Sequence, residues 1–381
     1  KIVKVLIIPS WYPSKSYPNN GSFFKEQAEA FKREGIEVDI LCIDIPYRKT
    51  RKDFSYFTKN SYVENGINVY RYVFPVGVLH RFPKLYYVFL KWIAKRIYEK
   101  ELKGKKYDVI QAQSFLIGGY VGVCLKKTFG CKCVITEHTS KILKSDLNQV
   151  EKKVLKKCME ESDRFVCVSE NLKSNVMKMT QTQKNIEVFP NLVNEIFSYE
   201  KKEREPFIFV SIGNLIPLKR MDLLIEAFCD TFSKTENVKL EIVGSGIEEK
   251  NLENIIKKNN RESQIVLCGA LTRKEVSKVL KKSHVMALVS EKETFGIVYI
   301  EALASGNILI GSDNGGANDI ITKENGIILK DSSKLELGKT LRMMYEQYSQ
   351  YNSEQISKNA ICKYGEKAFV RRYRQLFEEV E

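Results

Sequence analysis

Short, nearly continuous apolar runs alternate with helical patterns along this chain. The first run, KIVKVLIIPS (residues 1–10), precedes SFFKEQAEAFKREG (residues 22–35), where Phe24, Ala28 and Phe31 have helical spacing and a glycine closes the segment. The next run, IEVDILCI, is again a strand pattern. Alternating strands and helices form parallel sheets whose two faces are covered. The pattern therefore predicts an α/β fold.

The alternation occurs twice, with a polar interruption between the two series. Residues 194–206 (NEIFSYEKKEREP) are rich in charge, and strand-like runs resume at FIFVSIG. A chain of 381 residues has room for two domains of ordinary size. We expect an N-terminal domain over residues 1–195, a second domain over 206–365 with the polar segment as linker, and a C-terminal helix over 366–381.

The chain is strongly basic, with 62 Lys and Arg against 47 Asp and Glu and a formal net charge of +15. Such a charge suits nucleic acid, an anionic membrane surface or a phosphorylated substrate. No basic run reaches six residues and no finger, helix-turn-helix or RNP pattern occurs, which argues against nucleic acid as a partner. Nine scattered cysteines without a C-x-x-C pair, and only three histidines, predict a reduced cytoplasmic protein with no metal site.

One segment, KLYYVFLKWIAKRIYEKELK (residues 84–103), departs from the alternation. Leu85, Val88, Phe89 and Trp92 follow i, i+3, i+4, i+7 spacing, and basic residues occupy the other sides. Two interpretations stay open. The apolar face packs into the core beneath a solvated basic face, or the helix lies on an anionic membrane surface.

Two acids eight positions apart, Glu293 and Glu301, lie in the segment SEKETFGIVYIEALASG. The segment predicts a strand end, a loop and a helix that begins near Gly296. At such an N-terminus the backbone N–H groups of Phe295, Gly296 and Ile297 can bind phosphate oxygens, and a carboxylate one turn further on can accept hydrogen bonds from two ribose hydroxyls. Taken alone, the spacing also fits two acids flanking an ordinary helix.

A second segment, SIGNLIPLKRMDLLIEAF, places two cations before a helix. A strand ends near Gly213, and Lys219 and Arg220 precede a helix that starts near Asp222. Two cations at this junction suit a diphosphate, whose negative charge grows as it leaves. A solvated pair of charges is the alternative.

In combination, these motifs resemble the retaining nucleotide-sugar glycosyltransferases of family 4. The ordered motifs are GNLIPLKRMDLLIEAF, VGSG, ETFGIVYIEALASG and DNGGA, and the opening WYPS…NNGSFFKEQAEAFKREGIEVDIL is also similar. The resemblance implies the GT-B fold, with two Rossmann-like domains whose parallel sheets face each other across a cleft. It also implies that the first domain binds the acceptor and the second domain the nucleotide-sugar donor. The C-terminal helix is expected to cross back to the first domain, and transfer is expected to need neither a protein nucleophile nor a metal.

The resemblance implies roles for single residues. Lys219 matches the lysine on the donor diphosphate, Glu293 the acid that contacts the donor sugar, and Glu301 the acid that holds the ribose hydroxyls. His138, in TEHTS, is similar to a family histidine near the donor sugar, whereas a lone histidine there is more simply a core residue. Gly21 matches the glycine-rich loop after the first strand. Further implied donor-side positions are Gly213, Asn214, Arg220, Gly244, Phe295, Gly296 and Ile297.

One departure concerns the donor pocket directly. The family usually has an arginine after the glycine of the lysine motif, and here Asn214 stands at that position. Arg220 can substitute for it, or the donor pocket is less positive.

The resemblance gives UDP as the default donor nucleotide, with GDP second, and it does not fix the acceptor. Enzymes that build capsule and other surface polysaccharides on polyprenyl-diphosphate lipids are the most similar, which implies a protein peripheral on the inner face of the cell membrane. A soluble or protein acceptor and a GT-B epimerase or phosphorylase are alternatives. A dinucleotide oxidoreductase is suggested by VGSG after a strand, but Glu249 stands where a third glycine belongs.

Overall fold

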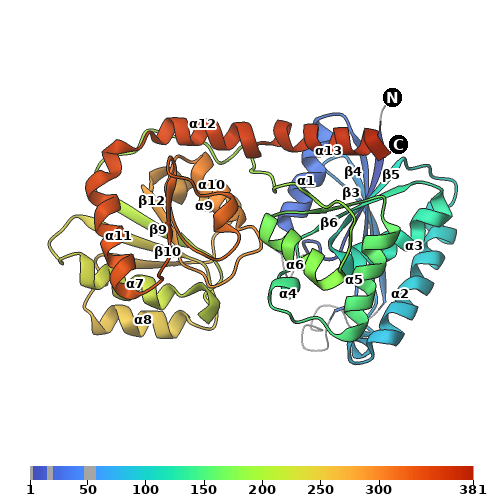
Figure 1. The fold of residues 1–381 in the computed structure, drawn as a ribbon, viewed down its shortest axis with the longest axis horizontal. Coiled ribbons are helices and arrows are strands. Elements are labelled where there is room, and N and C mark those ends of the chain that lie inside the picture. Colours follow the sequence, from blue (N-terminus) through green and yellow to red (C-terminus); the bar gives the residue numbers. More distant parts are fainter. Residues whose placement is uncertain (1–2, 15–19, 47–56, 381) are drawn as a thin grey trace. The chain divides into compact units, whose positions relative to one another are not determined.

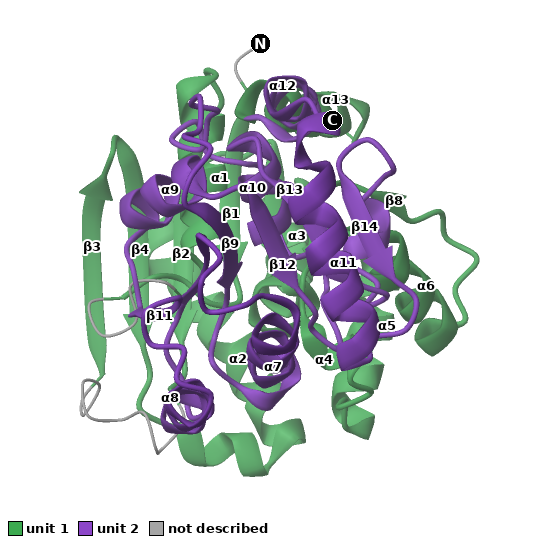
Figure 2. Cartoon of the chain, turned by 90° about the vertical axis from the view of Figure 1, so that its left-hand side faces the viewer, with its two compact units in different colours: residues 1–190, 366–381 green, residues 191–365 purple. Residues whose placement is uncertain are grey.

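The computed structural model describes residues 3–14, 20–46 and 57–380. The chain divides into two compact units (Figures 1 and 2). Unit 1 contains Lys1–Pro190 and Glu366–Glu381, and unit 2 contains Asn191–Gly365. Each unit has one largely parallel sheet flanked by helices, so the α/β prediction is confirmed.

The described part of unit 1 has an eight-stranded sheet in the order β3-β4-β2-β1-β5-β6-β7-β8, in which the β3–β4 pair alone is antiparallel. Its strands are β1 (Lys4–Pro9), β2 (Glu37–Asp44), β3 (Thr58–Glu64), β4 (Ile67–Val73), β5 (Val109–Gln113), β6 (Lys132–Glu137), β7 (Arg164–Cys167) and β8 (Glu187–Val188). Its helices are α1 (Ser22–Arg33), η2 (Gly77–Arg81), α2 (Pro83–Ile97), η3 (Tyr98–Leu102), η4 (Ser114–Gly119), α3 (Tyr120–Phe129), α4 (Ser140–Leu143), α5 (Gln149–Glu161), α6 (Glu170–Thr180) and α13 (Glu366–Val380).

Unit 2 has a fully parallel six-stranded sheet in the order β11-β10-β9-β12-β13-β14. Its strands are β9 (Phe207–Ile212), β10 (Val238–Val243), β11 (Ile265–Gly269), β12 (Val285–Leu288), β13 (Ile308–Ser312) and β14 (Gly326–Leu329). Its helices are η5 (Pro217–Lys219), α7 (Met221–Thr231), α8 (Glu249–Lys258), α9 (Arg273–Lys282), α10 (Ile297–Ala304), η6 (Ala317–Asp319), α11 (Lys334–Gln347), η7 (Tyr348–Gln350) and α12 (Ser353–Tyr364).

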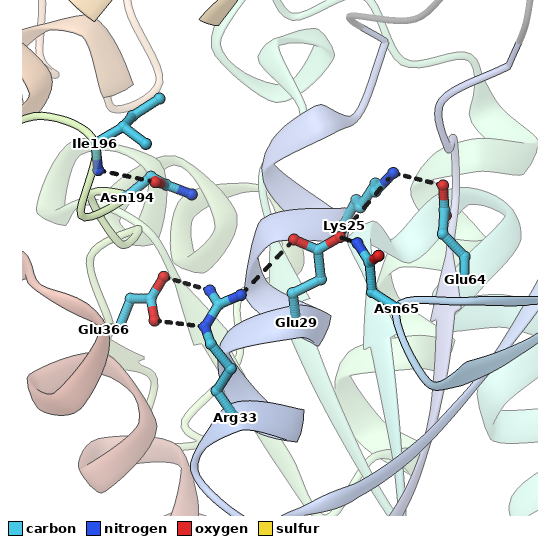
Figure 3. Close-up of polar contacts among 8 residues, drawn as sticks. All are labelled: Lys25, Glu29, Arg33, Glu64, Asn65, Asn194, Ile196 and Glu366. Carbon is cyan, nitrogen blue, oxygen red and sulfur yellow. Dashed lines mark hydrogen bonds and ion pairs between the residues drawn. The ribbon is translucent and has the colours of Figure 1, made fainter. Parts of the chain in front are cut away.

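Helix α13 belongs to unit 1 and packs on α1. The Phe31 ring lies 5.4 Å from Phe369 and 5.7 Å from Phe377, measured between ring centroids. At the end of α1, the Arg33 guanidinium donates through Nε and Nη2 to the two carboxylate oxygens of Glu366 (Figure 3). An apolar stripe and one forked ion pair therefore attach the last helix to the first.

The polar segment expected as a linker packs as part of unit 2. Lys202 Nζ donates to the backbone oxygens of Leu280, at 3.1 Å, and Ser283, and Ser277 Oγ donates to Ile196 O at 2.7 Å. Burial lowers the Lys202 pKa to about 7. Lys202 thus bonds to carbonyls at the end of a helix, and residues 194–206 belong to unit 2, which differs from the expected linker.

Helix α2 has two apolar faces. The buried face consists of Tyr86, Tyr87, Leu90, Ile93, Ala94 and Ile97. In contrast, the exposed fractions of Leu85, Val88 and Trp92 are 57%, 65% and 53%. Core packing of the stripe that contains these three residues is therefore the wrong interpretation. Within residues 3–14, 20–46 and 57–380, no helix has the length and hydropathy needed to cross a bilayer.

Candidate active site

In unit 2, the predicted lysine and the first predicted acid meet at the carboxyl ends of the parallel strands. Lys219 ends η5 in the connection after β9, and Glu293 lies in the loop after β12. Lys219 Nζ donates to Glu293 Oε1, and both side chains are largely buried. The two loops are also joined through the backbone, because Glu291 N donates to Leu218 O at 3.0 Å. The sheet thus brings together a cation and a carboxylate that lie 74 residues apart.

Glycines let the neighbouring loops approach the lysine closely. A Cβ at Gly213 would lie 3.5 Å from Lys219 Cε, so the lysine stem passes directly over this residue. Gly244, with φ +145°, leaves no room for a side chain, because a Cβ there would lie 1.8 Å from Gly213 O. Both predicted glycines therefore lie against the Lys219 loop and serve backbone packing.

The other two residues of the lysine motif take different positions. Arg220 has a left-handed backbone (φ 51°, ψ 41°) and is the residue before the first turn of α7. Asn214 is exposed in a tight turn, in which its backbone oxygen accepts from Ile216 N at 2.9 Å.

The DNGGA motif supports the loop that carries Glu293. Glu293 N donates to Asn314 O at 3.1 Å, and Glu293 forms a parallel bridge with Gly315. A Cβ at Gly316 would lie 2.7 Å from Phe295 O and 2.9 Å from Glu293 Cβ. The sequence signals this motif only through its resemblance, and the structure supplies its physical reason, which is close backbone contact.

The N-terminus of α10 carries no side-chain cap. Gly296 precedes the helix with φ 78°, and its Cα lies so close to the Tyr299 ring that a Cβ would be 2.6 Å from it. The first N–H groups of any helix lack partners within the helix, so those of Ile297 and the next residue are suited to an anion. Phe295 points its side chain into the core and is 2% exposed, so it can contribute its backbone alone.

The second predicted acid, Glu301, is buried within α10 and has a charged partner. Arg273 Nη1, from α9, donates to Glu301 Oε1, and Arg273 Cζ lies 4.9 Å from the Phe197 ring centroid. Sequence reasoning missed Arg273, because neither its spacing nor its neighbours connect it with the acid. The Arg273 guanidinium thus orients the Glu301 carboxylate.

His138 lies in unit 1, at the carboxyl end of β6. Its ring Nε2 is 2.7 Å from Gln113 Oε1, and its centroid is 4.9 Å from that of Phe24. The Gln113 amide donates to Gln27 and Gln111, each at 3.0 Å, so its oxygen accepts from the histidine and Nε2 carries the proton. Burial lowers the His138 pKa to about 3, which keeps the ring neutral at pH 7.

A buried carboxylate beside His138 was also missed from the sequence. Glu137 accepts from Ser114 Oγ and from the backbone N–H groups of Phe115, His138 and Thr139, at 2.7–2.9 Å. Burial raises the Glu137 pKa, and these hydrogen bonds oppose that shift. The network joins the ends of β5 and β6 and fixes the backbone that holds the histidine.

Gly21 directly precedes α1 in unit 1. Its φ of 75° is left-handed, and a Cβ would lie 2.8 Å from Trp11 O. Glycine is therefore required here both by backbone conformation and by close approach.

Because His138 is neutral in the folded protein, it should make the stability of the protein depend on pH. The unfolded residue takes up a proton near pH 6.5, whereas burial lowers the folded pKa to about 3. Between these values the unfolded state binds more protons, so the free energy of unfolding falls as the pH falls below about 6.5. The free energy of unfolding is measured with urea at pH 5.0 and 7.5. It should change less with pH in His138→Gln than in the unsubstituted protein, and the difference in slope should correspond to at most about one proton. An unchanged dependence would contradict this account.

Two family models match the chain in succession. Residues 21–195 match "Glycosyltransferase Family 4", and residues 193–362 match "Glycosyl transferases group 1". An uncharacterized glycosyltransferase of Methanocaldococcus jannaschii, MJ1607, is 27% identical over 353 residues, which are 85% of this chain and 84% of that protein. The GPI3 subunit of the Saccharomyces cerevisiae phosphatidylinositol N-acetylglucosaminyltransferase is 25% identical over 289 residues, 72% of this chain and 62% of that protein.

Solved structures resemble the whole fold. Sucrose-phosphate synthase from Thermosynechococcus elongatus has a TM-score of 0.76 at 16% identity, covering 99% of this chain and 98% of that chain. Anabaena HepE in complex with UDP and glucose has a TM-score of 0.74 at 15% identity, covering 99% and 100%. With the family models, these likenesses show that the chain belongs to the family 4 glycosyltransferases and has their GT-B fold of two parallel-sheet α/β domains.

Proposed function

We propose that this protein is a retaining glycosyltransferase that moves a sugar from a nucleoside diphosphate sugar to a glycan or lipid-linked acceptor. The observation that carries the proposal is the Lys219–Glu293 pair at the strand ends of unit 2. Three residues after the acid, Gly296 introduces the uncapped N-terminus of α10. A diphosphate and its sugar require a cation, a carboxylate, and backbone N–H groups that have no acceptor within their own helix.

The proposed chemistry is positioning and charge stabilisation. Lys219 and the N–H groups of Phe295, Gly296 and Ile297 bind the diphosphate and neutralise the charge that develops as it leaves. Glu293 contacts the donor sugar. Arg220 adds positive charge for the diphosphate, in place of the arginine that the family usually has at the position of Asn214.

The remaining roles concern the nucleoside and the sugar. Glu301, oriented by Arg273, accepts from the ribose hydroxyls. Gly213 and Gly244 keep the Lys219 loop close to the sheet. From unit 1, His138 and Gly21 contribute to sugar binding. The leaving diphosphate takes the acceptor proton, so no protein nucleophile takes part.

We propose UDP as the donor nucleotide and a reaction that needs no metal. Structures with this fold include HepE with UDP and glucose and a pneumococcal O-GlcNAc transferase with UDP and GlcNAc, which supports UDP as the first choice. Lys219 and the positive end of α10 supply the charge that a metal otherwise provides. The rate should therefore be unchanged by EDTA, and a rate that falls with EDTA and returns with Mg²⁺ or Mn²⁺ would contradict metal independence.

A thermal-shift screen against UDP, GDP, ADP and TDP tests the donor proposal. A ligand at 100 times its Kd stabilises the protein by about 2.7 kcal/mol. In a domain of roughly 150–250 residues, each kcal/mol raises Tm by about 2–4 °C. A selective shift with one nucleotide supports the donor site and names its base, and no shift with any of them would contradict it.

The exposed face of α2 supports a membrane-associated acceptor. Leu85, Val88 and Trp92 are exposed, and the adjoining Lys91 and Lys95 are exposed as well. Apolar side chains with lysines beside them fit a membrane surface with anionic lipids, where each basic residue contributes about 1 kcal/mol. We propose that α2 rests on the cytoplasmic leaflet and that the acceptor is carried there on a polyprenyl diphosphate.

Vesicle flotation tests this surface. The protein should bind phosphatidylglycerol-containing vesicles at low salt, and Val88→Ser/Trp92→Ser should reduce binding at least 10-fold, because two exposed apolar anchors are lost. Leu335→Ser removes a similarly exposed apolar side chain from α11 and should leave binding unchanged. If the unsubstituted protein does not float with anionic vesicles at low salt, the membrane proposal is wrong.

A further inference from the structure

Two buried glutamines lie on one interior strand of the unit 1 sheet. Strand β5, between β1 and β6, carries Gln111 and Gln113, which are two positions apart and therefore on the same face. Both side chains are fully buried. Strands buried on two faces are normally apolar, as Val109, Ile110 and Ala112 of the same strand are. Packing alone does not require two amides at these positions.

The amide of Gln113 is held in one orientation by its own partners. Its nitrogen donates to the side-chain oxygens of Gln27, in α1, and of Gln111, each at 3.0 Å. Its oxygen lies 2.7 Å from His138 Nε2. Because both amide hydrogens already have acceptors, the oxygen faces the histidine. Gln113 is thus a hydrogen-bond acceptor that points in a fixed direction.

The hydrogen-bonded chain continues past Gln111 to the last helix. Gln111 Nε2 donates to Thr136 Oγ1 at 2.8 Å, and this hydroxyl lies 2.8 Å from the Tyr373 hydroxyl on α13. Thr136 and Tyr373 are buried as well. Since Gln111 accepts from Gln113 and donates to Thr136, a reversed Gln113 amide would face like groups unless Gln111 turned over too. Side chains from α1, β5, β6 and α13 therefore fix the Gln113 amide together.

The His138 ring keeps one atom that can bond to a ligand. Within residues 3–14, 20–46 and 57–380, its only hydrogen bond is the one from Nε2 to Gln113. Burial lowers the His138 pKa to about 3, so the ring is neutral at pH 7. With the proton on Nε2, Nδ1 has a lone pair and can only accept. A ligand that bonds to this ring must therefore donate, as a sugar hydroxyl does.

We propose that Gln113 is a positioning residue for His138, which fixes the ring and keeps its proton on Nε2, so that Nδ1 accepts from a hydroxyl of the transferred sugar. This inference rests on the proposed function, in which His138 contributes to sugar binding. It deepens that function by naming the residue that controls this contact. Gln113 is fully buried and acts through the histidine. An apolar side chain would fill its place without setting the position of the proton.

Nuclear magnetic resonance follows the ring directly, because the chain has only three histidines. In protein isotopically labelled at the histidine nitrogens, two-bond proton–nitrogen correlations tell the protonated ring nitrogen from the unprotonated one. His138→Gln assigns the His138 signals. At pH 7 we expect a proton on Nε2 that resonates downfield and exchanges slowly with water. In Gln113→Met, which has a similar shape but no amide, this proton should move upfield and exchange faster, because it has lost its acceptor.

The kinetic effect should concern the sugar and not the nucleotide. Gln113→Met should lower kcat/KM for the nucleotide sugar about 10-fold, while the Kd of the free nucleoside diphosphate changes by less than about 2-fold. Gln113→Glu is the conservative variant, because a carboxyl oxygen can take the place of the amide oxygen. It should keep the Nε2–H signal and at least about a third of kcat/KM, since the amides of Gln27 and Gln111 can turn to donate to it.

Gln264→Met is the control for the loss of a buried amide elsewhere. Gln264 lies in unit 2, is buried, accepts from Arg261 and donates to the backbone oxygens of Ser233 and Glu236. Both methionine variants should lower the free energy of unfolding, because each leaves buried groups without a partner. Gln264→Met should nevertheless leave the His138 signals and kcat/KM unchanged.

Four results would overturn the inference. They are an unchanged Nε2–H signal in Gln113→Met, a change in this signal that Gln264→Met reproduces, a changed signal with unaltered kcat/KM, and a nucleotide affinity that falls as much as kcat/KM. The spectra need no substrate, so they separate this inference from the proposed function. If the unsubstituted protein consumes no nucleotide sugar, the proposed function fails, and the spectra still decide whether Gln113 positions His138.

Discussion

Glu293→Gln should lower kcat by about 100-fold or more while the Kd for the free nucleoside diphosphate changes by less than about 3-fold. In the proposed site this carboxylate touches the sugar, so its removal affects the transition state and leaves the free nucleotide without a lost partner. Lys219, which now donates to Glu293, keeps its charge for the diphosphate. Steady-state kinetics and calorimetric titration with the nucleotide measure the two effects.

Glu301→Gln is the matched comparison for Glu293→Gln, because Glu301 lies in α10 and Glu293 lies in the loop that leads into this helix. Loss of charge-assisted hydrogen bonds to the ribose should weaken the free nucleotide about 10-fold, which is about 1.4 kcal/mol. Both acids have a cationic partner and both substitutions preserve side-chain size, so they differ in the part of the donor that they contact. Equal effects of the two substitutions on nucleotide affinity would contradict the assigned roles.

Gly244→Ala should destabilise unit 2 by roughly 4 kcal/mol, a loss at the upper end for a single substitution. The added Cβ would lie 1.8 Å from Gly213 O, a backbone atom that cannot move without shifting the Lys219 loop. The φ of +145° adds conformational strain to the clash. Urea unfolding measures the loss in stability, and activity should fall with it.

Gly269→Ala separates the cost of backbone strain from the cost of the steric clash at Gly244. Gly269 also has a positive φ, +70°, but a Cβ there meets nothing within 4 Å. Its substitution should cost about 1–2 kcal/mol, the ordinary strain of a side chain in the left-handed region. Equal losses for the two variants would mean that the close contact between the Gly244 and Gly213 loops contributes nothing.

The parallel core of each sheet could be predicted from the sequence because parallel strands are buried on two faces and read as continuous apolar runs. The antiparallel strand β3 is mostly exposed, has no such run, and was not predicted. The helix expected near Gly296 begins at Ile297, and the one expected near Asp222 begins at Met221. Glycine and the change of hydrophobic period mark these boundaries locally, so no long-range information is needed.

Features that depend on tertiary contacts could not be predicted. In α2, the exposed stripe with Val88 and the buried stripe with Leu90 both have helical spacing, so the pattern could not tell which one is buried. The partner of Glu301 comes from a different helix, 28 residues away. Lys202 lies in a charged segment that is typical of a solvated linker, yet its ammonium donates to backbone oxygens at the end of α9.

The stereochemistry of sugar transfer tests whether this protein is a retaining glycosyltransferase. The protein is incubated with the nucleotide sugar that the thermal-shift screen selects and with a panel of mono- and disaccharides as acceptors, and the reaction is followed by NMR. We expect release of one nucleoside diphosphate per glycoside formed, retention of the donor's anomeric configuration, and loss of both signals in Glu293→Gln. Inversion at the anomeric carbon, or no nucleoside diphosphate release from any nucleotide sugar, would contradict this expectation.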